Sequence, residues 1–280
     1  MMHKRIFAGF TAMALTAALL TGCGSAQTND TEKAAAADTG SAVQTAQTEQ
    51  TDINVFAAAS MQETLTKLAN EYMDEHSDVN IQLNLDSSGT LKTQIEEGAD
   101  CDLFISAAQK QMNELADEDY VNDSTRVDLL ENKVVLVVPK DNPKDIQSFQ
   151  DIADKADLIA LGNEDVPVGQ YSEEILTNLN ILDKLEQDGK ITYGSNVKEV
   201  TTQVAEGAVD CGIVYETDAF SAGLDYVDEA GTDLCKQAIY PAAVMSSSKN
   251  EQAAQEFLNY LESEHAGEVF ESVGFAFLMK

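Results

Sequence analysis

From residue 52 onward the chain alternates short apolar segments with amphipathic ones, and this alternation constrains the fold more than any other feature. "INVFAAA" at 53–59 and "KVVLVVP" at 133–139 have the length and composition of buried strands, whereas "MQETLTKLANEYMDEH" at 61–76 has helical periodicity. Strands that alternate with helices predict mainly parallel sheets with helices on both faces. We therefore expect an α/β fold, for which 44% apolar residues supply a substantial core.

The rest of the chain continues this alternation. Further strands are expected at 80–86, 101–107, 157–162, 192–195, 211–217, 224–228 and 238–246. Further helices are expected at 90–98, 109–118, 172–185, 197–207, 250–264 and 266–273, the last with Gly274 as its C-cap.

One pattern occurs twice: "QIEEGADCDLFIS" at 94–106 and "QVAEGAVDCGIVY" at 203–215 each place a helix end and an E-G-A turn before an apolar strand. Either the two halves contain similar α/β units, or the match reflects only the common use of glycine to end a helix. In the first case Cys101 and Cys211 occupy matching places in different halves and do not pair. Spacing and flanking strands favour buried, unpaired thiols for these two cysteines and for Cys235.

The N-terminus has the pattern of a secretion signal, with a basic start and the apolar run "IFAGFTAMALTAALL" at 6–20. Its last residues, "LTGC", resemble a bacterial lipobox, which implies cleavage before Cys23 and attachment of lipid, including palmitate, to that cysteine. A plain secretory peptide or a short membrane anchor is the alternative, although the run is short for a span. We predict a signal peptide at 1–22 and, at 23–51, the lipidated cysteine with a polar, flexible tether.

Charge and histidine content argue against several classes of protein. The chain has 17 Lys and Arg against 49 Asp and Glu, a formal net charge of −32, which would repel nucleic acid. After the predicted signal peptide the sequence has two histidines, His76 and His265, and no HExxH motif, which disfavours a zinc site or a Ser-His-Asp triad. No G-x-S-x-G motif supports Ser60 or Ser88 as a nucleophile. We therefore expect neither an enzyme nor a cofactor.

Ser60 lies where the first expected strand meets the first expected helix, directly after three alanines at 57–59. One interpretation is local, because Ser60 and Glu63 have the S-x-x-E spacing of a capping box. The other is functional. The first N–H groups of a helix are unsatisfied and favour an anion, and small alanines let a ligand approach the backbone.

Three more loops combine a helix start with neutral donors: Ser87 to Gly89, Pro167 to Gly169, and Ser195 to Val197. Gly89 is expected to give its turn conformational freedom, and Asn196 has Glu199 at capping spacing. In a doubly wound sheet such loops lie at the carboxyl ends of strands, where ligands bind.

These loops are poor in positive charge, since Lys198, beside the last of them, is their one basic residue. Hydroxyls and amides without a counter-charge suit a small, fully ionised oxyanion. A protonated oxyanion also needs an acceptor for its proton, and Asp86 is the candidate acceptor beside these loops.

Together these motifs resemble those of the molybdate-binding proteins, the substrate-binding lipoproteins of molybdate ABC importers. The resemblance covers residues 52–280 and rests on "VFAAAS", "SSGTL", "DLFISA", "VPVGQY", "GIVY" and "VGF". It implies a two-lobed periplasmic-binding-protein type II fold, in which each lobe is a mixed, mainly parallel sheet flanked by helices and the ligand lies in the cleft. It also implies that one lobe comprises 52–132 plus 240–280 and the other 133–239.

The ligand positions of that family correspond here to Ser60 and Ser88, through hydroxyl and amide, to Val168 and Val197, through their amides, and to Tyr215, through its phenol. Molybdate would thus be held as an oxyanion, with no side chain bound directly to the metal. Relatives often have alanine at the position of Val168, but a main-chain donor survives that change.

The resemblance implies a monomeric solute-binding protein, lipid-anchored at the outer face of the cytoplasmic membrane. Its two lobes would close by a hinge motion on molybdate, and also on tungstate, and deliver the anion to an ABC permease and its ATPase. A sulfate or phosphate receptor is the alternative, because a sequence does not measure the size of a cavity.

Overall fold

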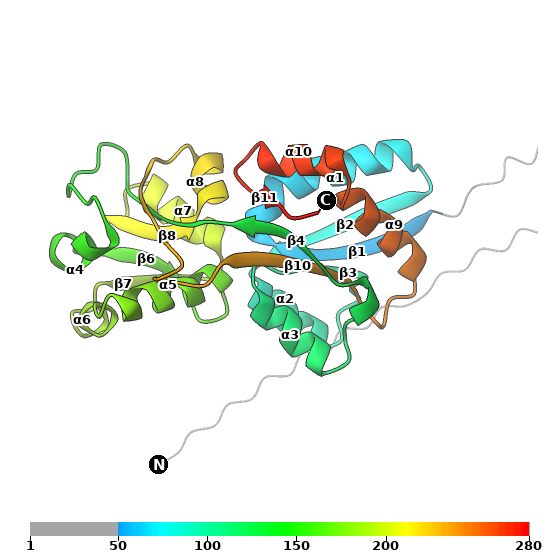
Figure 1. The fold of residues 1–280 in the computed structure, drawn as a ribbon, viewed down its shortest axis with the longest axis horizontal. Helices are drawn as coiled ribbons and strands as arrows, with labels where there is room; N and C mark the ends of the chain where they lie inside the picture. Colours follow the sequence, from blue (N-terminus) through cyan, green and yellow to red (C-terminus); the bar gives the residue numbers. More distant parts are fainter. Residues whose placement is uncertain (1–49, 280) are drawn as a thin grey trace, which may run out of the picture. The chain divides into compact units, whose positions relative to one another are not determined.

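Two separate sheets organise the part of the chain that the computed structural model describes, residues 50–279 (Figure 1). The first has the strand order β11-β4-β10-β3-β1-β2 and the second the order β7-β6-β8-β5-β9. We call each sheet with its helices the first lobe and the second lobe. The two-lobed α/β fold expected from the sequence is confirmed. The predicted signal peptide, Cys23 and the tether up to residue 49 lie outside the described residues.

The first lobe contains six strands and five α-helices. Its strands are β1 (Thr51–Ala58), β2 (Val79–Asp86), β3 (Leu103–Ile105), β4 (Val127–Asn132), β10 (Ala238–Val244) and β11 (Ala276–Phe277). Its helices are α1 (Gln62–Glu75), α2 (Ser88–Glu96), α3 (Gln109–Asp117), α9 (Glu251–Leu261) and α10 (Glu264–Glu271), with short 3₁₀ turns η1 (Ala59–Met61) and η2 (Asp123–Thr125).

The second lobe contains five strands and five α-helices. Its strands are β5 (Val134–Val137), β6 (Ile159–Gly162), β7 (Ile191–Gly194), β8 (Cys211–Tyr215) and β9 (Tyr226–Glu229). Its helices are α4 (Ile152–Lys155), α5 (Pro167–Asn178), α6 (Leu182–Gln187), α7 (Val197–Ala205) and α8 (Glu216–Ala222), and η3 (Phe149–Asp151) precedes α4. No helix among residues 50–279 combines the length and the apolar character needed to cross a membrane.

Strand β1 is apolar from Val55 to Ala58 because this part of the strand is buried on both faces. It pairs in parallel with β2 on one side and with β3 on the other. The side chain of Val55 packs in the core shared with α1 and α9, whereas Phe56, the next residue, packs with side chains of α2 and α3. Strands covered on both faces favour continuous apolar runs over alternation.

The chain crosses between the two sheets twice, and the crossing segments are neighbours. β4 ends at Asn132 and β5 begins at Val134, so only Lys133 separates them. The return segment leads from β9 into β10, whose first residue, Ala238, pairs with Asn132. The connection between the lobes therefore includes an antiparallel pair, β4 and β10, which Figure 1 shows running side by side.

Several elements differ from the sequence-based expectation. The sequence does not predict β4 or α8, because charged residues interrupt the apolar pattern in both segments. The helix expected at 172–185 is wrong as one element: α5 ends near Asn178, and Asn180 has a left-handed conformation with φ 59°. Gly274 is also not the C-cap of α10, which is Ser272; Gly274, with φ 108°, lies two residues further on.

Cys101, Cys211 and Cys235 are buried and unpaired, as the sequence predicts. Cys101 packs in the core beneath α2 and α3, and Cys211 begins β8 in the second lobe. Burial raises the pKa of the Cys211 thiol to about 12 and that of Cys235 to about 11, so both stay protonated at neutral pH.

Candidate functional site

A small cavity of about 10 Å³ lies between the two lobes, and we call it the site cavity. All five predicted ligand positions line it, three from the second lobe and two from the first. Its lining residues are Ala58, Ala59, Ser60, Asp86, Ser87, Ser88, Ala107, Val166, Pro167, Val168, Val197 and Tyr215. Residues that are up to 157 positions apart in the chain thus face one small space because the carboxyl ends of the strands meet there.

Ser60 does not form the capping box that its spacing predicts. A 3₁₀ turn, η1, follows β1, so that α1 begins only at Gln62, and its N-cap residue, Met61, makes no side-chain capping bond. The Ser60 hydroxyl instead lies 2.9 Å from the hydroxyl of Tyr240, and the Glu63 carboxylate binds Lys198 of the second lobe. The Ser60 hydroxyl therefore does not cap the helix that follows it.

Ser88 occupies the first position of α2, and Ser87 caps this helix by accepting a hydrogen bond from the Thr90 amide at 3.1 Å. The Ser88 oxygen accepts a hydrogen bond from the Ala107 amide at 2.9 Å, and the residue is fully buried. Because its oxygen already has a donor, the Ser88 hydroxyl hydrogen is available to an acceptor in the site cavity.

Val168 and Val197 bring main-chain donors from the second lobe. Pro167 is the first residue of α5, so Val168 lies in its first turn, and Val197 is the first residue of α7. The first-turn N–H groups of a helix have no acceptor within the helix, and the helix dipole favours an anion there. The capping predicted for Asn196 is confirmed, since its side chain accepts from the Glu199 amide at 3.1 Å.

Tyr215 ends β8 and is almost fully buried among aromatic rings. Its ring packs edge-on against Tyr171 and Tyr240, and its hydroxyl lies 3.5 Å from the Ala107 carbonyl oxygen, a long hydrogen bond. Burial raises the pKa of Tyr215 well above its ordinary value of 10. Tyr215 is consequently a neutral hydroxyl donor at neutral pH.

The lobes meet directly beside the site cavity. The Gly89 amide donates to the Asp165 carbonyl oxygen at 3.0 Å, and a Cβ at position 89 would lie 2.2 Å from that oxygen. The expectation that Gly89 serves the conformational freedom of its turn is therefore wrong. It lies within α2, and glycine is required because the second lobe approaches so closely.

The single basic side chain near the cavity is neutralised by carboxylates of both lobes. Lys198 Nζ lies 2.9 Å from Glu63 of α1 and 3.1 Å from Asp218 of α8. Asp218 is fully buried, and this burial raises the pKa of its carboxyl to about 6, although the neighbouring Lys198 acts in the opposite direction. Lys198 thus joins the two lobes and is not a free counter-charge for an anion.

Asp86 is the one carboxylate in the lining of the site cavity. Its Oδ1 accepts from the Ser87 amide at 2.8 Å and from the Asn196 side chain, across the lobes, at 3.3 Å. Both bonds involve the same oxygen, so Oδ2 is the atom that a protonated ligand would use as an acceptor.

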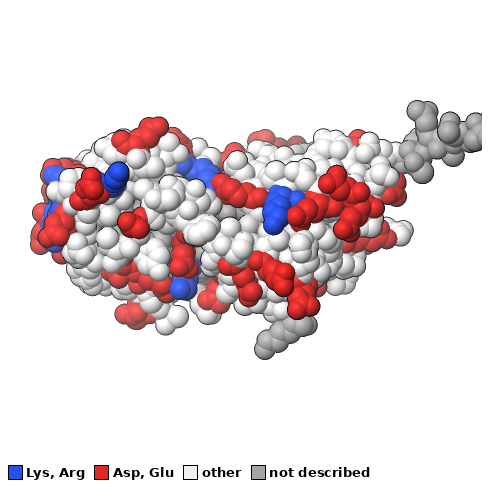
Figure 2. Space-filling model, turned by 90° about the horizontal axis from the view of Figure 1, so that it is seen from above, with Lys and Arg blue, Asp and Glu red and all other residues white. Residues whose placement is uncertain are grey.

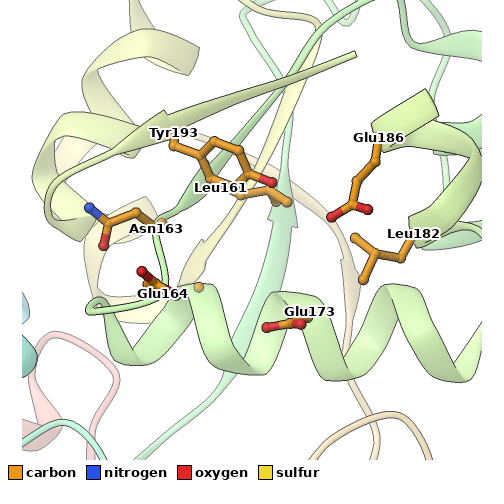
Figure 3. A pocket seen from close by; sticks show the side chains of 9 residues that line it. Leu161, Asn163, Glu164, Glu173, Leu182, Glu186 and Tyr193 are labelled. Atoms are coloured by element: carbon orange, nitrogen blue, oxygen red, sulfur yellow. The ribbon is translucent and has the colours of Figure 1, made fainter. Parts of the chain in front are cut away.

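A second hollow lies within the second lobe, and its chemistry is different (Figure 3). Glu164, Glu173 and Glu186 line it together with Tyr193, Leu161 and Leu182. Three carboxylates disfavour an anion there. Among residues 50–279, no group of three or more His, Cys, Asp or Glu is arranged to hold a metal ion.

Sequence reasoning missed Tyr240, Asn132 and Asp218, which surround the predicted ligand positions. Tyr240 lies in the apolar segment "AIYPAAV", where it is indistinguishable from a core residue. Asn132 ends a strand that the sequence does not predict, and its burial in the structure is the first sign of its role.

Comparison with known proteins gives consistent results. Residues 53–276 match the family model for bacterial extracellular solute-binding proteins. The chain is 39% identical to the "Putative ABC transporter substrate-binding lipoprotein YvgL" of Bacillus subtilis, over 94% of this chain and 95% of that one. It is 35% identical to the molybdate-binding protein ModA of Haemophilus influenzae, over 80% of this chain and 89% of that one.

A solved structure shares the fold. The periplasmic molybdate-binding protein of Azotobacter vinelandii matches with a TM-score of 0.73 and 23% sequence identity, over 80% of this chain and 98% of that one. At this identity the likeness concerns the fold alone.

Gly89→Ala is expected to weaken binding of molybdate by about tenfold or more, because the added methyl group prevents the lobes from closing. The unfolding temperature of the ligand-free protein should be unchanged or slightly higher, since alanine favours a helix more than glycine does. Calorimetric titration and thermal melts measure the two effects. Wild-type affinity in the variant would show that the contact with Asp165 is not needed for closure.

Glu63→Gln removes the first-lobe half of the ion pair with Lys198 and is expected to weaken binding of molybdate by about two- to fivefold at low salt, and less at high salt. If only the general negative field mattered, removing a carboxylate would strengthen anion binding instead. The matched control is Glu71→Gln on the same helix, whose partners Lys67 and His265 belong to the first lobe. A gain in affinity for Glu63→Gln would contradict the role of this pair in closure.

Proposed function

The chain belongs to the bacterial extracellular solute-binding proteins, and on that premise we propose that it captures molybdate, and also tungstate, in the site cavity for delivery to an ABC importer. Members of this family bind solutes for transporters and are not enzymes. The ligand positions are those expected from the sequence: Ser60, Ser88, Val168, Val197 and Tyr215.

The observation that carries the proposal is the donor chemistry of the site cavity. The two serine hydroxyls, the Tyr215 hydroxyl and the two first-turn amides offer hydrogens without a free positive charge. Such a set matches a tetrahedral dianion that carries no proton of its own. Its desolvation is costly, so closure of both lobes around it has to supply many fixed donors at once.

The acidic surface makes internal donors necessary. On the face shown in Figure 2, acidic side chains form several patches, and basic ones are sparse. A net charge of −32 offers no long-range attraction for an anion. Affinity therefore has to come from contacts formed inside the cavity.

Sulfate remains the alternative in charge and shape, and phosphate is the alternative that Asp86 would favour. Hydrogen phosphate carries a proton that needs an acceptor, and Asp86, whose Oδ1 takes both of its hydrogen bonds, lines the cavity. The kinship with molybdate-binding proteins supports molybdate over both.

We further propose that Cys23 carries a lipid, including palmitate, which anchors the protein at the outer face of the cytoplasmic membrane. The lipobox-like "LTGC" and the name of the Bacillus subtilis relative, a lipoprotein, support this. The tether would let a monomeric receptor reach the permease and its ATPase. The proposed receptor would have a signal peptide at 1–22, a tether at 23–51 and two hinged units, 52–132 plus 240–280 and 133–239.

Calorimetry with molybdate, tungstate, sulfate and phosphate tests the ligand. Molybdate and tungstate are expected to bind more tightly than sulfate and phosphate. Tighter binding of sulfate or phosphate would contradict the choice of anion, and no binding of any of them would contradict the proposed function. Ser88→Ala is expected to lose one hydrogen bond to a charged acceptor, about 1.5–3 kcal/mol, or about 10- to 150-fold in affinity. Tyr215→Phe should weaken binding in the same direction.

The matched control for Ser88→Ala is Ser263→Ala. Ser263 caps α10 by accepting from the Ala266 amide at 3.2 Å and does not line the site cavity. This variant should lose about 1 kcal/mol of stability and keep its affinity, the reverse of the pattern for Ser88→Ala. Unchanged affinity in both Ser88→Ala and Tyr215→Phe would show that the anion binds elsewhere.

Cys23→Ala is expected to abolish labelling of the protein by palmitate and to release it from the membrane fraction, because the thiol that accepts the lipid is gone. Metabolic labelling followed by fractionation of cells measures both. Equal labelling of wild type and variant would contradict the anchor and favour a plain secretory signal.

A further inference from the structure

Four buried polar side chains form a chain of hydrogen bonds that starts at the site cavity and reaches the crossing between the lobes. Ser60 Oγ lies 2.9 Å from Tyr240 Oη, and Asn132 Nδ2 lies 3.2 Å from Tyr240 Oη and 2.9 Å from Thr217 Oγ1. Each of the four residues is 5% exposed or less. Buried polar groups of this kind have to be mutually satisfied, so their hydrogens can be assigned from the contacts.

The orientation of the Asn132 amide is fixed by the main chain. Its Oδ1 accepts from the Lys133 amide at 2.9 Å, so its NH₂ group must face the other way. The two hydrogens of this group are then directed at Thr217 and Tyr240. Asn132 lies at the end of β4, where the chain crosses to the second lobe, and all of its polar atoms are used.

The Tyr240 hydroxyl consequently accepts from Asn132 and has its own hydrogen to donate. Its nearest hydrogen-bond partner is Ser60 Oγ at 2.9 Å, and we infer that the hydrogen is directed at this oxygen. Burial raises the pKa of Tyr240 well above its ordinary value of 10, which keeps this hydrogen in place at neutral pH. Since the Ser60 oxygen receives a hydrogen bond, the serine hydrogen is free to point into the site cavity.

We propose that Tyr240, held by Asn132, is a positioning residue that commits the Ser60 hydroxyl to donate its hydrogen to the bound oxyanion. The inference rests on the function proposed above. Tyr240 would donate a hydrogen bond to the Ser60 oxygen, just as the Ala107 amide donates to the Ser88 oxygen at 2.9 Å. Both serines thereby act as donors, which favours an anion without a proton over one that needs an acceptor.

A purely structural role for Tyr240 is the competing explanation, because its ring packs against Tyr215 and Phe275. The two roles differ in their dependence on Ser60. If Tyr240 acts through the serine hydroxyl, its own hydroxyl has no value for binding once that serine is absent. If it acts through packing, the loss is the same with or without Ser60.

The test is a double-mutant cycle of Tyr240→Phe and Ser60→Ala in the purified protein, with molybdate titrated by calorimetry. Tyr240→Phe alone is expected to weaken binding by about 5- to 30-fold, the value of one hydrogen bond of this kind. In the Ser60→Ala background it should change affinity by less than about twofold. An equal loss in both backgrounds, or no loss in either, would overturn the proposal.

Tyr171→Phe is the matched control. Tyr171 belongs to the same aromatic group, but its hydroxyl lies 3.4 Å from the Gln237 carbonyl oxygen and does not reach Ser60. It should keep wild-type affinity in both backgrounds. A loss that equals that of Tyr240→Phe would assign the effect to the aromatic group as a whole and overturn the proposal.

Asn132→Asp keeps the proposal testable if Tyr240→Phe does not fold. A carboxylate at this position accepts the Tyr240 hydrogen and turns it away from Ser60, so binding should weaken more in the wild-type than in the Ser60→Ala background. The repulsion of the added charge is present in both and cancels in the comparison. Equal losses of affinity in the two backgrounds would overturn the proposal, but the proposed function would stand as long as the wild type binds. If the wild type bound none of the four oxyanions, both would be overturned.

Discussion

The proposed site has to compensate the free energy that is lost when an anion is removed from water. A dianion enclosed without a counter-charge recovers its hydration energy only from donors that are already fixed in place. In this protein Lys198, the nearby cation, is shared between Glu63 and Asp218. The anion would then be stabilised only by the strand ends, the first turns of α5 and α7 and the buried hydroxyls. This requirement explains why the cavity is small and why both lobes contribute to it.

A hydroxyl can donate or accept a hydrogen bond, and its surroundings decide which it does. In this site, protein donors bind to the serine oxygens, which leaves the serine hydrogens for a ligand. The Ala107 amide occupies the Ser88 oxygen, and Tyr240 is inferred to occupy that of Ser60. The Ala107 carbonyl oxygen lies 3.5 Å from Tyr215, a weak contact that a charged acceptor would outcompete. Ala107, just after β3, thus contacts proposed donors from both lobes through its main chain, although its own side chain has no polar atom.

The sequence predicts much of the fold from local signals, whereas the five ligand positions are implied by its resemblance to the molybdate-binding proteins. Strand and helix periodicity, glycine turns and small residues before helices can be recognised within a few residues of each other. What the sequence does not predict depends on contacts between distant segments. Ser60 and Tyr240 are 180 positions apart, so the capping box was the only partner for Ser60 visible in the sequence, and it is not formed. The need for glycine at position 89 arises likewise from Asp165 in the other lobe.

The proposed ligand positions and the contacts between the lobes lie on the same short segments, which would link closure and binding energetically. Gly89 follows Ser88 and contacts Asp165; Lys198 follows Val197 and contacts Glu63. A movement that separates the lobes therefore withdraws the donors and breaks the bridging contacts together, so neither set is formed fully without the other. Each contact between the lobes is weak by itself, and a ligand that is bound only in the closed state shifts the equilibrium by the sum of them. An anion too small to reach both sets of donors would bind one lobe and leave the other unengaged, which gives the cavity its means of discriminating by size.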